Sequence, residues 1–231
     1  MFFCTRTHFP PVRLAVLARS VHRRRALPKS VGIKHCARPE PAYFPLSTDE
    51  DQHMDGSDTR VTLSARPDWQ YLLRDLYEFY RTIPAGGSKT IRNHQRIVRE
   101  RISRAITANA QIVERVPTSK PVTAHLNRAL ARGHLEKHGA FISTLETIAP
   151  ELEWQYGYEK VPRGLEKKYA FAELAGPFGP VVIEDLILGL VLFAPGCTYP
   201  AHSHDGITES YICLTGAVSE NDTGVYAPGS L

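Results

Sequence analysis

The sequence predicts an α+β fold in which a helical segment precedes a mainly β half. Over residues 59–152, apolar residues recur at the spacing of amphipathic helices. From Trp154 onward, β-branched and aromatic residues gather in short runs separated by Gly-Pro turns, which is the pattern of strands. These boundaries assign residues 153–231 to the β half and leave residues 1–58 as a separate basic extension.

The net positive charge of the chain lies in the extension. Its first 53 residues contain nine Lys and Arg against four Asp and Glu, a net charge of +5, whereas the rest of the chain has a net charge of −1. The body therefore gives no electrostatic reason to expect a nucleic acid partner. Arginine clusters and scattered prolines predict disorder in the extension. Because Met54 is the only methionine besides Met1, we expect translation from Met54; an Arg-rich transit-like segment is the alternative.

Three helical stretches are predicted in the middle of the chain. The first, "RPDWQYLLRDLYEFYRTI", has a proline suited to a first helical turn. The second covers about residues 89–113. It carries a basic stripe, which we interpret as a solvated face rather than an anion site, made of Lys89, Arg92, Arg96 and Arg99. The third covers about residues 120–152, and we expect it to break near Gly133 or Gly139.

Apolar runs and cysteines limit the classes of protein to which the chain can belong. The longest apolar run, "LILGLVLFAP" from Leu186, is too short to cross a bilayer and is interpreted as a buried strand. The four cysteines, which show no CxxC pair or framework spacing, are Cys4, Cys36, Cys197 and Cys213. They predict unpaired thiols in a reducing compartment, and we expect a cytoplasmic protein.

The chemistry is concentrated in "GCTYPAHSHDGITESYICLTG", residues 196–216. On a strand, alternate side chains share a face, so His202 and His204 point the same way. After a turn, a second strand can return Glu209 and Tyr211 to that face. Neutral imidazoles and a carboxylate suit a divalent transition metal, with Fe, Mn, Ni, Co and Zn as candidates.

The framing of this stretch resembles a known motif. Gly196 is followed by five residues, His202-x-His204, four residues, Glu209, six residues and Gly216. This pattern resembles the first motif of the cupin superfamily, whose fold is a small double-stranded β-barrel with a metal inside. The resemblance implies that the β half, residues 153–231, is a cupin barrel.

The resemblance extends to one group within that superfamily. Tyr199, three residues before His202, and Tyr211, two residues after Glu209, are similar to the motif of the cupin-type lyases that cleave dimethylsulfoniopropionate. The resemblance to the DddL group of these lyases covers about residues 65–231. The other segments that carry it are "GGSKTIRNH", "KPVTAHL", "WQYGYEKVP", "KYAF", "LILGLVLFAP", "ESYICLTGAVSEND" and "YAPGSL".

The resemblance implies a role for each matching residue. His202, His204 and Glu209 match metal ligands. Tyr211 matches the tyrosine taken as the general base, and Tyr199 matches a second active-site tyrosine. The reaction implied is that of a carbon–sulfur lyase, which converts the sulfonium substrate into dimethyl sulfide, acrylate and a proton.

The end of the sequence affects this expectation. The fourth metal ligand of the family is a histidine in a second motif, which follows a "PGSL"-like stretch, and this sequence ends at such a stretch with Leu231. We therefore expect a chain truncated at its C-terminus, with an incomplete barrel. Three ligands and an open sheet edge predict weak metal binding or incomplete folding, and reduced activity.

The substrate and the alternatives complete the prediction. The cationic end of the substrate should lie against aromatic faces, for which Trp154, Tyr156 and Tyr158 are candidates; simple packing in a sheet is the alternative for each. Another metal-dependent cupin enzyme, such as a dioxygenase or isomerase, would share the ligands without needing Tyr211. A non-catalytic ligand-binding cupin is the third hypothesis. A small sulfonium compound is the expected partner, a homodimer is left open, and neither nucleic acid nor a membrane is expected.

Overall fold

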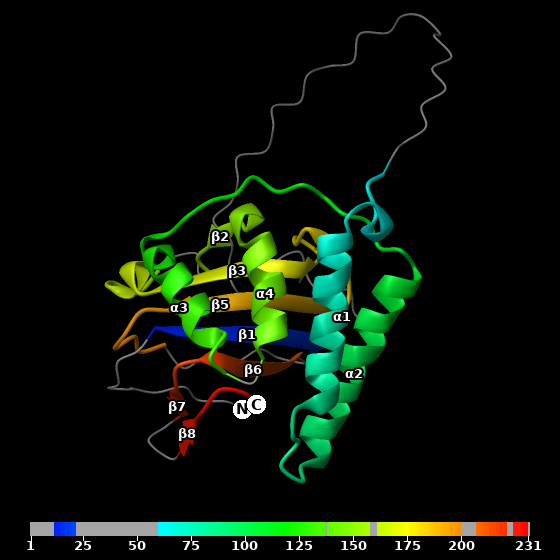
Figure 1. The fold of residues 1–231 in the computed structure, drawn as a ribbon. Helices are drawn as coiled ribbons and strands as arrows, with labels where there is room; N and C mark the ends of the chain where they lie inside the picture. Colours follow the sequence, from blue (N-terminus) through cyan, green and yellow to red (C-terminus); the bar gives the residue numbers. More distant parts are fainter. Residues whose placement is uncertain are drawn as a thin grey trace, which may run out of the picture.

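A mixed β-sheet forms the centre of the fold (Figure 1). The computed structural model describes residues 12–21, 60–136, 138–157, 161–199, 207–220 and 224–230. In spatial order, the strands of the main path are β2 (Trp154–Gln155), β3 (Tyr169–Gly176), β5 (Leu186–Phe193), β1 (Arg13–Val21) and β6 (Ile207–Thr215). These strands pair antiparallel, and β4 (Val181–Val182) adds to β3 in parallel. A separate two-stranded sheet consists of β7 (Val218–Glu220) and β8 (Gly224–Tyr226).

Helices cover one face of this sheet (Figure 1). They are α1 (Pro67–Thr82), α2 (Lys89–Thr107), α3 (Leu126–Gly133) and α4 (Gly139–Ile148). Short 3-10 helices span Leu63–Ala65, Pro121–His125, Ala149–Glu151 and Leu165–Lys167. Helices and a largely antiparallel sheet together confirm the predicted α+β class. A closed double-stranded barrel stays a prediction.

The helix boundaries follow local signals in the sequence. Ser88 caps α2, because its hydroxyl accepts the backbone N–H of Ile91 at 3.2 Å. This helix ends at Thr107 and not near residue 113, since Asn109 takes a left-handed conformation with φ of 50° and its side chain accepts the backbone N–H of Ser64. The third stretch breaks at Gly133, where α3 ends, and again before α4.

The strand β1 corrects the prediction of disorder over residues 1–58. That prediction is wrong for Arg13–Val21, which lie in the middle of the sheet between β5 and β6. Leu14, Val16 and Ala18 are fully buried against the helices. Burial of these alternate side chains stabilises the strand, which outweighs the polar composition around it. A chain beginning at Met54 would lack this strand, and the remainder of the extension lies outside the described residues.

The two faces of the sheet differ in chemistry. The face toward the helices belongs to one apolar cluster, which includes Val16, Leu188, Leu190 and Ile212. We call the opposite face the tyrosine face. Its apolar core consists of Leu17, Leu165, Tyr169, Phe171, Ile187, Val191, Phe193, Cys197 and Tyr199, with Tyr211 packed against it. Because side chains alternate along each strand, Arg19, Glu173 and Glu209 lie on the tyrosine face as well.

Gly189 shows how tightly the tyrosine face is packed. A Cβ atom at this position of β5 would lie 2.1 Å from a ring carbon of Phe171 on β3 and 2.9 Å from the carbonyl oxygen of Ala172. Only glycine therefore leaves room for the aromatic ring to lie across the neighbouring strand.

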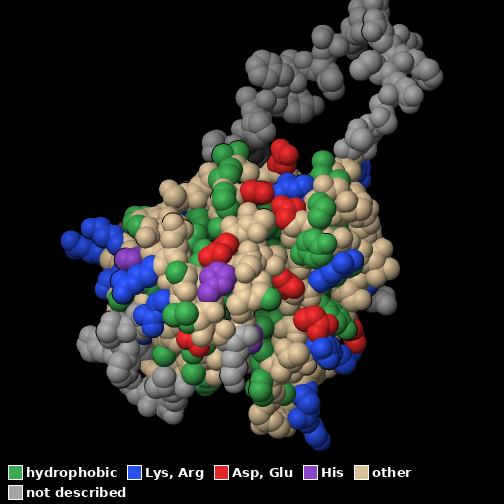
Figure 2. All heavy atoms as spheres, in the orientation of Figure 1, with side chains coloured by type: hydrophobic (Ala, Val, Ile, Leu, Met, Phe, Trp, Pro, Cys, Tyr) green, Lys and Arg blue, Asp and Glu red, His purple; other side chains and the backbone are tan. Residues whose placement is uncertain are grey.

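The outer surface of the helical layer carries charges of both signs. Figure 2 shows Lys and Arg side chains interspersed with Asp and Glu over this face. None of the helices in the described part of the chain is both long enough and apolar enough to span a bilayer.

Candidate active site

The predicted catalytic and metal-binding residues that the structure describes meet on the tyrosine face. Glu209 and Tyr211 lie two residues apart on β6, so both side chains point to this face. Tyr199, which follows β5, is buried in the same cluster. The two predicted histidine ligands, His202 and His204, lie outside the described residues.

The carboxylate of Glu209 is the centre of this arrangement. Its Oε1 atom lies 2.5 Å from Nε of Arg19 on β1, which is the residue directly opposite in the strand register. The Tyr211 hydroxyl donates to the same oxygen at 3.2 Å. The side chains of Arg19 and Glu209 are only 5% and 12% exposed. In such a buried setting a carboxylate needs a positively charged partner, and here the guanidinium supplies it.

Burial and charge set the protonation of these groups. Burial first, and then the negative charge of Glu209, raise the pKa of the Tyr211 phenol well above its usual value, while the charge of Arg19 opposes the rise. Burial works against the charge of Arg19, but the neighbouring Glu209 outweighs it and raises the pKa of the guanidinium. In this arrangement the phenol holds its proton at neutral pH and acts as a hydrogen-bond donor.

Aromatic rings pack against Tyr211 and against one another on the tyrosine face. The Tyr199 hydroxyl donates to the Tyr169 hydroxyl at 3.4 Å, and the two ring centroids are 4.9 Å apart. Tyr199 also meets Tyr211 edge-on at 6.5 Å and Phe193 at 5.3 Å. The ring faces and edges give this part of the sheet a low-dielectric surface that attracts cations.

Two of the three aromatic residues predicted to hold the sulfonium end are described, and Trp154 and Tyr156 lie on opposite sides of the sheet. Trp154 is buried in the cluster on the helix side of the sheet, away from the tyrosine face. Tyr156 packs against the tyrosine face, but its hydroxyl donates to the carbonyl of Glu166 at 2.7 Å and its ring lies under the ammonium group of Lys120 at 5.1 Å. Tyr158 lies outside the described residues.

A second buried carboxylate belongs to the same face. Glu173 on β3 is 8% exposed and accepts the backbone N–H of Phe178 at 3.0 Å, so it closes the turn that follows the strand. Burial raises the pKa of this carboxyl to about 7, although backbone N–H groups and two arginines, Arg115 and Arg19, oppose the rise. Glu173 therefore changes its charge close to neutral pH.

Of the three predicted metal ligands, Glu209 lies within the residues that the structure describes. Among the described residues, no three His, Cys, Asp or Glu side chains are grouped so as to hold a metal ion. Glu209 does fit one requirement, since its buried carboxylate already holds a cationic group.

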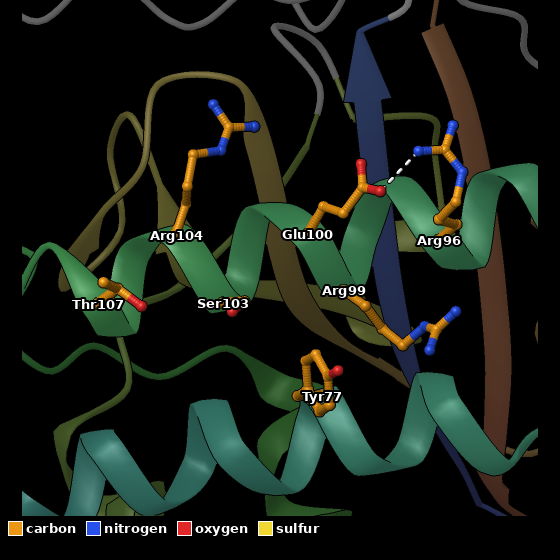
Figure 3. Close-up of a pocket in the computed structure, with 7 residues that line it drawn as sticks. All are labelled: Tyr77, Arg96, Arg99, Glu100, Ser103, Arg104 and Thr107. Carbon is orange, nitrogen blue, oxygen red and sulfur yellow. Dashed lines mark hydrogen bonds and ion pairs between the residues drawn. The ribbon is translucent and has the colours of Figure 1, made fainter.

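A cavity along α2, within the described part of the chain, is separate from the tyrosine face (Figure 3). It has a volume of about 390 Å³ and is lined by Tyr77, Arg96, Arg99, Glu100, Ser103, Arg104 and Thr107. Arg99 and Tyr77 lie between α1 and α2, whereas Arg96 and Arg104 point away from α1. The side chains of Arg96 and Arg104 are 54% and 69% exposed, and Arg96 pairs with Glu100 at 2.6 Å. The exposure of Arg96 agrees with the interpretation of the basic stripe as a solvated helix face, whereas Arg99 is half-buried between the two helices.

Sequence reasoning missed Arg19 and Glu173. For Arg19 the available signal was the strand-like alternation in "RLAVLARSV", which short length and flanking arginines obscured. For Glu173 it was an acidic residue within the apolar run "YAFAELAG", where a charge requires local partners.

The Arg19–Glu209 pair generates a prediction about stability. Replacing Arg19 with Met should lower the free energy of unfolding by about 3–5 kcal/mol, because it leaves the Glu209 carboxylate buried without its cation. The exposed pair is the control: Arg96→Met should cost no more than about 0.5 kcal/mol. Urea unfolding of both variants measures the difference. Equal losses in the two variants would contradict a buried ion pair at this position.

Glu173 generates a prediction about pH. Its carboxyl group has a pKa raised from 4.5 to about 7 in the folded protein, so the unfolded chain releases this proton first as pH rises. Stability from this group is therefore lost between the two values. Relative to wild type, the free energy of unfolding of Glu173→Gln should rise by about 1–3 kcal/mol on going from about pH 5 to about pH 8. The exposed Glu184→Gln serves as control in the same urea series, and a parallel trend in both variants would refute the assignment.

Comparisons with known proteins identify the family of the chain. A family model described as dimethylsulfoniopropionate lyase matches residues 93–230, which include Tyr199, Glu209 and Tyr211 but not β1. The chain is 49% identical over 172 residues to a protein of Cereibacter sphaeroides named as a candidate dimethylsulfoniopropionate lyase, DddL. The alignment covers 74% of this chain and 74% of that relative. No solved structure matches the chain. The chain belongs to the dimethylsulfoniopropionate lyase family.

Proposed function

We propose that this chain cleaves dimethylsulfoniopropionate to dimethyl sulfide, acrylate and a proton. The single observation that carries the proposal is the contact of the Tyr211 hydroxyl with the Glu209 carboxylate, at 3.2 Å on a buried aromatic face within the family-matched residues. This contact fixes the phenol at one point of the face, where it can take up a proton from a substrate.

The reaction is a β-elimination. A base removes a proton from the carbon next to the substrate carboxylate, the new electron pair forms the carbon–carbon double bond of acrylate, and the carbon–sulfur bond breaks with its electrons going to sulfur. The sulfonium is a good leaving group and needs no acid. The difficult step is the proton abstraction, because negative charge develops beside a group that is already a carboxylate.

Tyr211 is the proposed base, and Tyr199 stands beside it as the second active-site tyrosine. The raised pKa of Tyr211 means that its phenol must first lose a proton to water before it can act as the base. Positive charge brought to this face by the sulfonium group would lower the pKa of the phenol. Exclusion of water by the surrounding rings would strengthen this effect.

We further propose that His202, His204 and Glu209 hold a divalent transition metal, one of Fe, Mn, Ni, Co or Zn. A bound ion would act as a Lewis acid toward the substrate carboxylate. The imidazole and carboxylate donors suit such an ion, and the Glu209 carboxylate lies on the buried tyrosine face beside the Tyr211 hydroxyl.

The sulfonium end needs an aromatic surface. Tyr169, Tyr199 and Phe193 make mutual ring contacts on the tyrosine face, and we propose that they supply it in place of Trp154. The expected cytoplasmic location and a homodimer stay predictions.

A gas-release assay tests the function. The 231-residue chain incubated with dimethylsulfoniopropionate should release dimethyl sulfide into the headspace, and Tyr211→Phe should lower kcat by about 100-fold or more because it removes the base. Tyr71→Phe is the matched control, since Tyr71 is 57% exposed on α1, and it should retain wild-type activity. Absence of gas from wild type would overturn the lyase proposal. Undiminished gas from Tyr211→Phe would overturn the role of Tyr211 and favour a mechanism that does not use this phenol.

A further inference from the structure

A chain of buried polar side chains lies on the other side of the sheet, directly behind the candidate active site. The Tyr80 hydroxyl is 3.1 Å from Oγ of Ser210, and the same Oγ is 2.9 Å from Nε2 of His94. The other ring nitrogen, Nδ1, is 3.1 Å from Oγ of Ser20. All four residues are buried, with exposed fractions from 0% to 8%. We call these four residues the polar network.

The polar network joins the helical layer to the two strands that carry the ion pair. Tyr80 comes from α1 and His94 from α2. Ser210 lies on β6 between Glu209 and Tyr211, and Ser20 follows Arg19 on β1. Because strand side chains alternate between faces, each serine anchors to the helices while its neighbours point to the tyrosine face. The imidazole of His94 thus bridges the strands on one side of the sheet, where Arg19 and Glu209 bridge them on the other.

Apolar side chains surround the polar network, so its hydrogen bonds favour one register of β1 and β6. Buried hydroxyl and imidazole groups are stable only when their hydrogen bonds are made. A one-residue slip of β6 would turn Ser210 to the tyrosine face and would place Glu209 or Tyr211 against His94 among apolar side chains. The hydrogen bonds of the polar network are made in the observed register of β1 and β6.

We infer that Tyr80, His94 and Ser210 are positioning residues that hold β6 so that Glu209 and Tyr211 face the substrate. They touch neither the substrate nor the reacting atoms and act through the strand backbone. This role also gives a reason for the helical segment, since α1 and α2 then fix the strand that carries the chemistry. The catalytic consequence rests on the proposed lyase function, whereas the anchoring of β6 does not.

The test uses the full 231-residue chain with Ser210→Ala, Tyr80→Phe and, as a conservative variant, Ser210→Thr. The matched control is Ile102→Val, because Ile102 is fully buried on α2 two turns from His94 and belongs to the apolar cluster and not to the polar network. Each variant is compared with wild type by urea unfolding, by hydrogen–deuterium exchange of the β6 amides, and by kcat and KM for dimethylsulfoniopropionate.

We expect Ser210→Ala to accelerate exchange of the β6 amides about 10-fold beyond any change in the other strands. Its kcat should fall about 10- to 100-fold while KM changes by less than about three-fold, because misplaced catalytic groups slow the chemical step more than binding. Tyr80→Phe should show the same pattern to a smaller extent. Ser210→Thr, which retains the hydroxyl, should keep most of the activity. Ile102→Val should lower the free energy of unfolding about as much as Ser210→Ala does, while its kcat stays within about two-fold of wild type.

Two results would overturn the inference. One is β6 exchange in Ser210→Ala that matches Ile102→Val, because the hydroxyl would then not anchor the strand. The other is a kcat in Ser210→Ala within about two-fold of the control, because the network would then contribute stability alone. If wild type releases no dimethyl sulfide, the lyase proposal fails, and the exchange comparison still decides whether the polar network anchors β6.

Discussion

A buried carboxylate that stays ionised must have a positive partner, and at Glu209 this requirement connects the sheet, its strand β1 and the candidate chemistry. The partner is Arg19, and it reaches the tyrosine face only because β1 lies between β5 and β6. Insertion of β1 joins the strands of the β half into one sheet and buries Leu14, Val16 and Ala18 against the helices. The family-matched residues supply the carboxylate and the phenol, while the cation comes from outside them.

The two faces of the sheet make different contacts, and the proposed chemistry depends on both. On the tyrosine face, aromatic rings exclude water around Glu209 and Tyr211, which strengthens each electrostatic contact there. On the helix side, an apolar cluster supplies most of the stabilising burial, and the polar network fixes where β6 lies within it. The same alternation of side chains serves both purposes. Ser210 therefore belongs to the helical layer, although its two neighbours belong to the site.

Local patterns in the sequence predicted much of the fold and part of the site. The helices follow from 3.6-residue periodicity and caps, as at Ser88, and Glu209 and Tyr211 share a face because strands have a period of two. Long-range pairing was not predictable in this way. Nine residues of "RLAVLARSV" become a strand only through the partners on both sides, and Trp154 falls on the helix side because of how its short strand pairs with β3. The contacts of His94 and Glu173 likewise depend on residues distant in the sequence or on the turn after the strand.

The placement of β1 beside β6 can be measured directly with a cysteine that the chain already contains. In the observed register Ala15 lies opposite Cys213, so Ala15→Cys should form a disulfide with Cys213 on mild oxidation. Peptide mass spectrometry should then find residues 15 and 213 joined in the folded protein. Leu14→Cys, whose side chain would point to the helix side, should give no such link. A folded Ala15→Cys protein without this disulfide, or a link to Cys213 from position 14, would contradict the central position of β1 and with it the pairing of Arg19 with Glu209.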